Sequence, residues 1–202
     1  MFFREITNIE DPFFPAWLDA LEMGFPAFER NLPSVFFDLL KGREANNPQS
    51  LRRHIVAALD KEEGALEGFI VYQLNPPVLY LWYLLVKPHF RCIGIGSQMF
   101  NEIVDRAVDC EAVLWEVERP DVAVDLAGQL EAERRVGFYR KLGGKVVENV
   151  IYRQPSLRPD QPSRLMYIMF LPLMQISDQR VMELIEMTFD GITIPDEPLR
   201  LT

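Results

Sequence analysis

The sequence contains only two cysteines, Cys92 and Cys110, and only two histidines among its 202 residues. Two cysteines are too few for the disulfide framework of a small secreted domain. The longest apolar run, Val78 to Val86, has nine residues, far short of the roughly 20 that a membrane-spanning helix needs. Residues 1–10 lack the basic segment and following apolar run of a signal peptide. We therefore expect a cytoplasmic protein with no membrane partner.

Charge and composition narrow the classes of partner. Acidic residues outnumber basic residues by 30 to 21, a formal net charge of −9. A surface of this sign repels nucleic acids and anionic lipids, so no nucleic-acid partner is expected. The acidic excess would favour a cationic ligand such as an amine, but acidic cytosolic proteins are common and plain solubility is the preferred explanation. With 49% apolar residues the chain can build a packed core, and its length suits a single domain over residues 1–202.

Periodicity along the chain predicts a mixed α/β fold that begins with antiparallel strands. The expected order is a strand, two helices, a three-strand meander, a helix, a strand, a helix, two strands and a terminal helix. The polar stretch 42–50 contains proline and is expected to be a loop. The expected strands are 2–6, 54–59, 66–74, 78–86, 112–117, 145–152 and 165–171, and the expected helices begin near residues 13, 33, 97, 125 and 177.

The strongest local signals lie between residues 78 and 109. Val78 to Val86 is apolar at every position, which is typical of a strand covered on both faces. Residues 97–109 form the clearest amphipathic helix in the chain. Between them lies the short glycine-containing turn Arg91-Cys92-Ile93-Gly94-Ile95-Gly96.

A turn of this kind can hold a phosphate group. The first backbone N–H groups of a helix are unpaired, and with the helix dipole they attract anionic oxygens. Glycine permits close approach and a positive φ, and Arg91 could add a charged contact. Alone, the fragment also fits an ordinary strand-to-helix turn. It matches neither the P-loop nor the dinucleotide fingerprint.

The wider pattern resembles a known family. Leu84 to Ser97 is similar to the acetyl-CoA motif of the GNAT N-acetyltransferase superfamily, Arg/Gln-x-x-Gly-x-Gly/Ala between the fourth strand and the third helix. Phe138-Tyr139-Arg140-Lys141-Leu142-Gly143 resembles the second signature of that family, Phe-Tyr-x-Lys-x-Gly. The resemblance implies the acyl-CoA N-acyltransferase fold over about 2–171, with a mostly antiparallel sheet splayed at strands four and five. Residues 172–202 would be an added C-terminal helical extension.

The resemblance also implies acetyl-CoA as co-substrate, with no metal. The backbone of Leu84, Leu85 and Val86 would pair with the pantetheine arm of the cofactor. The following loop would bind the pyrophosphate, mainly through backbone N–H groups. Many members have glycine in place of Cys92 and lysine or arginine in place of Ile93, so a weaker attraction for phosphate is expected. The loop residues are Arg91, Cys92, Ile93, Gly94, Ile95, Gly96 and Ser97.

Tyr139 stands where the family has the residue that protonates the departing CoA thiolate. A positioned hydroxyl can protonate or hydrogen-bond that sulfur as charge develops on it. An ordinary phenol is a weaker acid than a thiol by about 1.5 pKa units, or roughly 2 kcal/mol, which geometry must offset. A core tyrosine is the alternative. The asparagine that many members carry ahead of Phe-Tyr is missing, and Ala132 and Arg135 stand in that motif.

The general base is the least determined part of the site. An amine is mostly protonated at neutral pH and must lose a proton before it attacks. Some members place a glutamate early on the fourth strand, where this chain has Tyr80. Glu116 and Glu118 share one face of the next strand by period two, and two adjacent carboxylates could raise the pKa of one of them. Of the two, Glu118 is favoured as the general base because it is nearer the end of the strand. The alternative is that neither is catalytic and both are solvated or pair with Arg119.

Two functions remain open from the sequence. The first is an active acetyl-CoA-dependent N-acetyltransferase that acts on a primary amine of a small molecule or a peptide. The second is a CoA-binding module that has lost catalysis and serves a regulatory or protein-interaction role. The acceptor pocket would be built by the first two helices and by the loops 118–129 and 153–164, which carry no recognisable motif. A monomer and a homodimer are both compatible with the sequence.

Overall fold

The computed structural model describes residues 1–159, 161–193 and 199–202. They form two compact units, each described by itself below. Unit 1 comprises Met1–Asn75, Leu81–Arg106 and Leu157–Gln161, and unit 2 comprises Pro76–Tyr80, Ala107–Ser156 and Pro162–Thr202. The single domain over 1–202 stays a prediction. The expected loop 153–164 and extension 172–202 include positions outside the described residues, namely 160 and 194–198.

Unit 1 contains four neighbouring strands in the order β1-β2-β3-β4. The pairs β1/β2 and β2/β3 are antiparallel, with Phe2 opposite Leu59 and Arg53 opposite Gln73. The strands are β1 (Phe2–Ile6), β2 (Arg53–Leu59), β3 (Leu66–Asn75) and β4 (Val78–Val86), of which residues 81–86 belong to this unit. The helices are α1 (Phe14–Gly24), α2 (Pro33–Glu44), α3 (Pro48–Leu51) and α4 (Ile95–Arg106).

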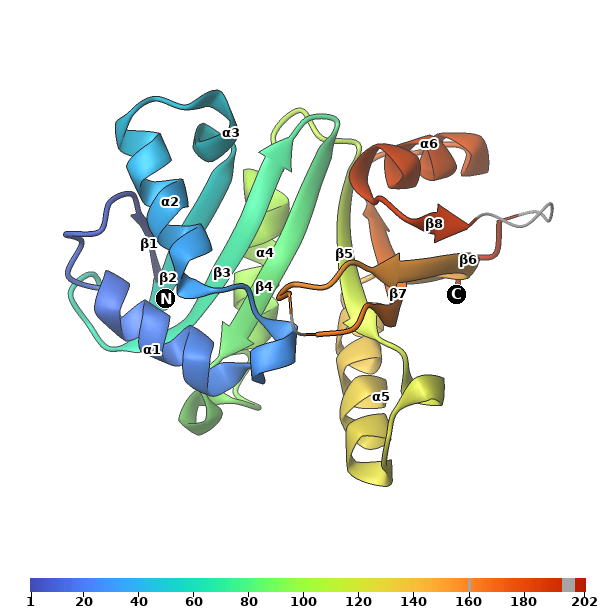
Figure 1. Cartoon of the computed structure of the whole chain (residues 1–202), viewed down its shortest axis with the longest axis horizontal. Coiled ribbons are helices and arrows are strands. Elements are labelled where there is room, and N and C mark those ends of the chain that lie inside the picture. Colours follow the sequence, from blue (N-terminus) through green and yellow to red (C-terminus); the bar gives the residue numbers. More distant parts are fainter. Residues whose placement is uncertain (160, 194–198) are drawn as a thin grey trace. The chain divides into compact units, whose positions relative to one another are not determined.

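Helices cover both faces of these strands (Figure 1), with α1 and α2 on one face and α4 on the other. On the first face, Trp17 packs edge-on against Phe36 and Phe69, at ring-centroid distances of 4.9 and 5.7 Å. On the second face, Gly68 lets Met99 of α4 approach the strand closely. Each of these apolar faces buries large side chains, which is the main stabilising term of the unit.

Two expectations for this unit were wrong. The stretch 42–50 is not a loop throughout, because α2 continues to Glu44 and α3 forms after Asn47. The Asn47 side chain caps α3 by accepting a hydrogen bond from the backbone N–H of Gln49 at 2.9 Å. Strand β4 is not equally buried on both faces. Its residues alternate along most of its length, and positions 80, 82, 84 and 86 are only half-buried. One face of β4 therefore has less cover than an unbroken apolar run predicts.

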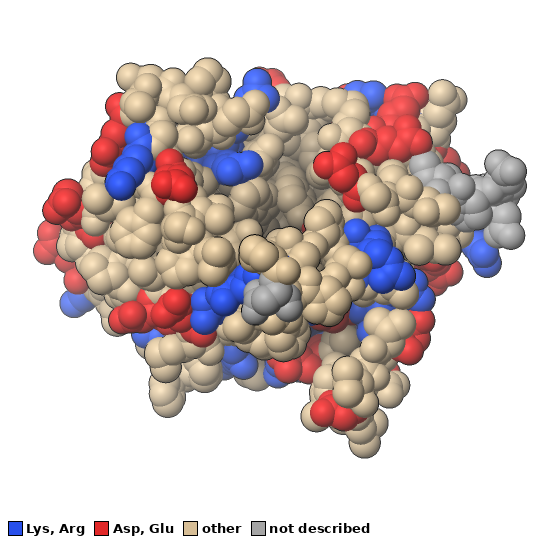
Figure 2. All heavy atoms as spheres, viewed as in Figure 1, with Lys and Arg blue, Asp and Glu red and all other residues tan. Residues whose placement is uncertain are grey.

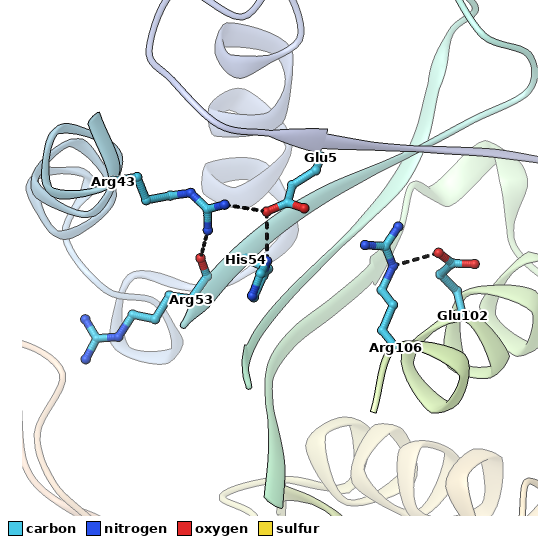
Figure 3. Close-up of polar contacts among 6 residues, drawn as sticks. All are labelled: Glu5, Arg43, Arg53, His54, Glu102 and Arg106. Atoms are coloured by element: carbon cyan, nitrogen blue, oxygen red, sulfur yellow. Dashed lines mark hydrogen bonds and ion pairs between the residues drawn. The ribbon is translucent and has the colours of Figure 1, made fainter. Parts of the chain in front are cut away.

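A polar cluster ties β1 to β2 and to the end of α2 (Figure 3). Glu5 Oε1 accepts a hydrogen bond from Arg43 Nη2 at 2.8 Å and lies 2.7 Å from His54 Nδ1. Arg43 also donates to the carbonyl of Arg53. Burial raises the pKa of Glu5, but the contact with His54 and the charges of Arg43 and Arg106 outweigh burial and lower it overall.

We expect Glu5→Gln to lower the free energy of unfolding by about 2 kcal/mol at neutral pH. Because the pKa of Glu5 is lower in the folded chain than in the unfolded chain, this contribution is present above the unfolded pKa and is lost as pH falls through the folded one. Urea unfolding at neutral and acidic pH measures the difference. Glu102→Gln, which removes the helical pair with Arg106, is the control and should cost about 0.5 kcal/mol. A Glu5→Gln deficit that stayed constant down to acidic pH would contradict the assignment.

Unit 2 contains strands in the order β4-β5-β7-β6-β8, and the first three residues of β4, which belong to this unit, run parallel to β5. The antiparallel pair β5/β7 runs from Ala112 opposite Pro172 to Glu118 opposite Met166. The strands are β5 (Ala112–Glu118), β6 (Lys145–Gln154), β7 (Arg164–Pro172) and β8 (Ile192–Thr193), and the helices are α5 (Leu126–Lys141) and α6 (Asp178–Thr188). Under α6 lies an apolar core that includes Val147, Phe170 and Leu184.

This arrangement confirms the predicted mixed α/β fold with a mostly antiparallel sheet. On the face drawn in Figure 2, acidic and basic side chains are interspersed and do not form one basic tract. Among the described residues, no helix combines the length and apolar character needed to span a bilayer.

Candidate functional site

The predicted phosphate loop lies in unit 1 between β4 and α4. After β4 ends at Val86, a single 3₁₀ turn over Pro88–Phe90 leads into residues 91–94. Helix α4 begins at Ile95, two residues earlier than expected. The backbone N–H of Gln98 donates to the Gly94 carbonyl at 3.1 Å. Residues 95–97 therefore form the first turn of the helix, where backbone N–H groups have no partner within the helix.

Gly94 leaves the backbone of this loop accessible to a ligand. Its φ is +91°, in the region that favours glycine, and a Cβ placed there would meet no atom within 4 Å. The Ile93 side chain is 67% exposed. A small ligand can therefore approach the loop backbone at Gly94 without a side chain in the way.

Arg91 braces the loop. Its Nε donates to the carbonyl of Val86 at 3.0 Å, which joins the turn to the last residue of β4. The remaining guanidinium nitrogens retain the positive charge that could attract an anion. Arg91 therefore has a positioning contact that the sequence did not indicate.

Cys92 is an exposed free thiol in the left-handed region, with φ of +65°. This conformation strains a side chain that has a Cβ, by about 1 kcal/mol. We expect Cys92→Gly to raise the free energy of unfolding by about 0.5 kcal/mol, because strain relief exceeds the added flexibility of the unfolded chain. Cys92→Ala removes the thiol but keeps the strain, so it should give no gain in denaturant unfolding. Equal stabilities of the two variants would refute this explanation.

Tyr139 lies on α5 in unit 2, packed against Trp115 of β5. The ring centroids are 4.9 Å apart with an interplanar angle of 47°, and the Phe138 ring centroid lies 5.0 Å from that of Tyr139. A Cβ on Gly144 would come within 2.8 Å of the Trp115 ring, so glycine is needed for this packing. Burial raises the pKa of the Tyr139 hydroxyl, the Glu118 carboxylate raises it further, and Arg135 partly offsets both.

Glu118 is held in an ion pair. Its Oε2 lies 2.6 Å from Arg135 Nη1, and Arg135 also contacts Glu131 at 3.0 Å. The expected alternative partner, Arg119, instead pairs with Asp121 at 2.6 Å. Arg135, which stands in the motif that usually carries the family's asparagine, therefore holds the carboxylate that sequence analysis favoured as the base.

Glu116 has quite different surroundings. Its carboxylate accepts hydrogen bonds from the hydroxyls of Tyr80 and Tyr152 and from the side-chain amide of Gln154. Burial raises the pKa of Glu116, and these three hydrogen bonds and the charge of Arg164 offset it only in part. Glu116 and Glu118 therefore have separate sets of hydrogen-bond and ion-pair partners.

The sequence did not indicate Tyr152 and Gln154. The expected strand ended at residue 152, whereas β6 runs to Gln154, and period two places both residues on one face. Residues 150–154, Val-Ile-Tyr-Arg-Gln, show no alternation of polar and apolar residues that could have indicated them. The described residues contain no group of three or more histidine, cysteine, aspartate or glutamate side chains able to hold a metal.

Each unit, taken by itself, contains groups that acyl-transfer chemistry uses. Unit 1 has an open N–H loop for an anion, and unit 2 has a phenol that remains protonated and a carboxylate with a raised pKa. A model of the acetyltransferase (GNAT) family matches residues 4–143. The chain belongs to the GNAT acetyltransferase family. Both predicted signatures lie within the matched residues.

Solved structures carry the same fold. A Bacteroides thetaiotaomicron protein assigned to the GNAT family is 21% identical, with a TM-score of 0.73 over 93% of this chain and 94% of that one. A Bacillus subtilis acetyltransferase in complex with CoA is 13% identical, with a TM-score of 0.54 over 85% and 98%. A chimera of the spermidine N-acetyltransferase SpeG from Vibrio cholerae and hSSAT is 14% identical, with a TM-score of 0.57 over 85% and 96%. No curated protein matches the sequence significantly.

Proposed function

We propose that this GNAT-family chain transfers an acetyl group from acetyl-CoA to a primary amine of a small molecule or a peptide. The observation that carries the proposal is the glycine turn at the start of α4, open at Gly94 and braced by Arg91. The CoA bound to the Bacillus subtilis relative supports this choice of cofactor.

The cofactor roles follow from the family resemblance. The backbone of Leu84, Leu85 and Val86 pairs with the pantetheine arm, and the half-buried state of Leu84 and Val86 is compatible with that role. The N–H groups of Gly94 to Ser97 hold the pyrophosphate, with Arg91 contributing charge. Cys92, Ile93 and Ile95 contribute through backbone alone.

Tyr139 serves the departing sulfur. Its raised pKa keeps the hydroxyl protonated at working pH, so the group is always able to donate. The same rise makes complete proton transfer to a thiolate less favourable. Tyr139 therefore acts mainly by hydrogen-bonding the sulfur as negative charge develops on it.

Glu116 is the better candidate for the general base. A raised pKa suits proton acceptance near neutral pH. Glu118 is engaged with Arg135, which lowers its availability as a base. The spermidine N-acetyltransferase chimera among the similar structures supports an amine acceptor. The free thiols Cys92 and Cys110 support a reducing, cytoplasmic setting.

One observation favours the alternative of a CoA-binding module without catalysis. Ile93 is exposed at a position where many members carry a basic residue, so the loop lacks one charge for the phosphate. Calorimetric titration with CoA and acetyl-CoA, followed by thiol release with a panel of primary amines, separates the two functions. Amine-dependent thiol release supports the enzyme, and binding without release supports the module. Failure of both cofactors to bind would overturn both.

A further inference from the structure

One of the two hydroxyl groups that donate to the Glu116 carboxylate belongs to a partly exposed side chain. Glu116 Oε1 accepts from both Tyr80 and Tyr152, the latter at 3.0 Å. Tyr152 is buried, with 3% of its surface exposed, whereas Tyr80 is only half-buried. Of the two tyrosines, Tyr80 is therefore the one with the larger exposed surface.

The surrounding contacts hold this pair in place. Phe189 packs edge-on against Tyr80 at 5.2 Å and lies 5.0 Å from Tyr152. Gln154 donates to Glu116 Oε2 and accepts from Arg164 at 3.1 Å. A carboxylate fixed in this way presents one oxygen to the Tyr80 hydroxyl, which is the geometry that a proton transfer between them needs.

We propose that Tyr80 takes the proton of the acceptor ammonium while its own hydroxyl proton passes to Glu116. This role rests on the proposed acetyl transfer. The ammonium N–H bond breaks, the proton forms a new O–H bond on Tyr80, and Glu116 becomes neutral. The amine nitrogen then attacks the thioester carbon, the C–S bond breaks with its electron pair on sulfur, and the second nitrogen proton goes to that sulfur. Glu116 finally returns its proton to solvent.

The surroundings of Glu116 set the direction of the pH dependence. The titratable or charged groups near it are Tyr80, Tyr152, Arg164 and, beside Tyr152, Asp190. A protonated Glu116 cannot take up the hydroxyl proton of Tyr80, so turnover should fall as pH drops through the raised pKa of Glu116. This fall on the acidic side of the pH profile, called the acidic limb below, should be visible in the turnover number at saturating amine.

The test compares Tyr80→Phe with Tyr152→Phe, which remove one hydrogen bond each from the same carboxylate oxygen. The assay is thiol release from acetyl-CoA with spermidine and with a lysine-containing peptide as probes. Tyr80→Phe should lower the turnover number about 100-fold and abolish the acidic limb, with CoA affinity unchanged. Tyr152→Phe should lower turnover about fivefold and keep the limb. Glu116→Gln should resemble Tyr80→Phe, and thermal unfolding checks that all three variants fold.

The outcomes separate this role from the proposed function. Equal losses in Tyr80→Phe and Tyr152→Phe would show that the hydroxyls only support the structure. Full activity of Tyr80→Phe in an active wild-type background would overturn the relay alone. A wild-type chain that binds acetyl-CoA but acetylates neither probe would overturn the relay together with acetyl transfer to these amines.

Discussion

Replacing Tyr139 with phenylalanine should lower the turnover number about 100-fold while leaving the affinity for CoA within about twofold of wild type. The substitution removes only the hydroxyl that we assign to the leaving sulfur. The aromatic packing against Trp115 is kept, so the fold of unit 2 should not change. Initial rates of thiol release and calorimetric titration with CoA measure the two quantities separately.

A matched control comes from the same unit. Tyr167 lies on β7 with its ring under the Arg119 guanidinium at 4.9 Å, a contact that phenylalanine also provides. Tyr167→Phe should therefore keep wild-type turnover. If Tyr139→Phe were equally active, Tyr139 would be a packing residue; if both variants lost activity together, the loss would come from the fold.

Gly94→Val should weaken CoA binding at least 10-fold. The φ of +91° strains any residue with a Cβ by about 1–2 kcal/mol, and the new side chain would occupy the open space over the loop where the pyrophosphate is expected. The dissociation constant from calorimetry is the direct measure. The thermal unfolding temperature shows how much of the strain affects the fold itself.

Gly137→Ala is the control for this substitution. A Cβ on Gly137 also meets no atom within 4 Å, but the residue lies inside helix α5 and has no positive φ. Alanine there should leave CoA binding unchanged and favour the helix by up to about 1 kcal/mol. Undiminished CoA affinity in Gly94→Val would exclude the loop as the pyrophosphate site.

The elements with long regular patterns were predictable from the sequence. Strand β4 runs from Val78 to Val86 as predicted, and α5 differs from its expected range by one residue at each end. The two-residue strand β8 was not predictable, because it exists only through its pairing with Ile151 and Tyr152. Such a strand has too few residues for any periodicity and depends on tertiary contacts.

The parts of the candidate site whose geometry is fixed by a local motif were predictable from the sequence. The parts that depend on contacts between side chains far apart in the sequence were not. The turn at Gly94 and the position of Tyr139 on a helix follow from short sequence signatures. The different surroundings of Glu116 and Glu118 do not, because they depend on Tyr152 and on Arg135, which come from other elements. Period two places both carboxylates on one face, but it cannot say which cation or hydroxyl each will meet.

Acetyl transfer from acetyl-CoA to an amine is tested most directly by one measurement. Wild-type protein is incubated with acetyl-CoA labelled in the acetyl group and with a panel of primary amines that includes spermidine. Mass spectrometry then follows the label. We predict labelled acetyl on an amine nitrogen, formed together with free CoA and strongly reduced in Tyr139→Phe. Tight binding of acetyl-CoA with no labelled amine across the panel would contradict the claim and favour a CoA-binding module without catalysis.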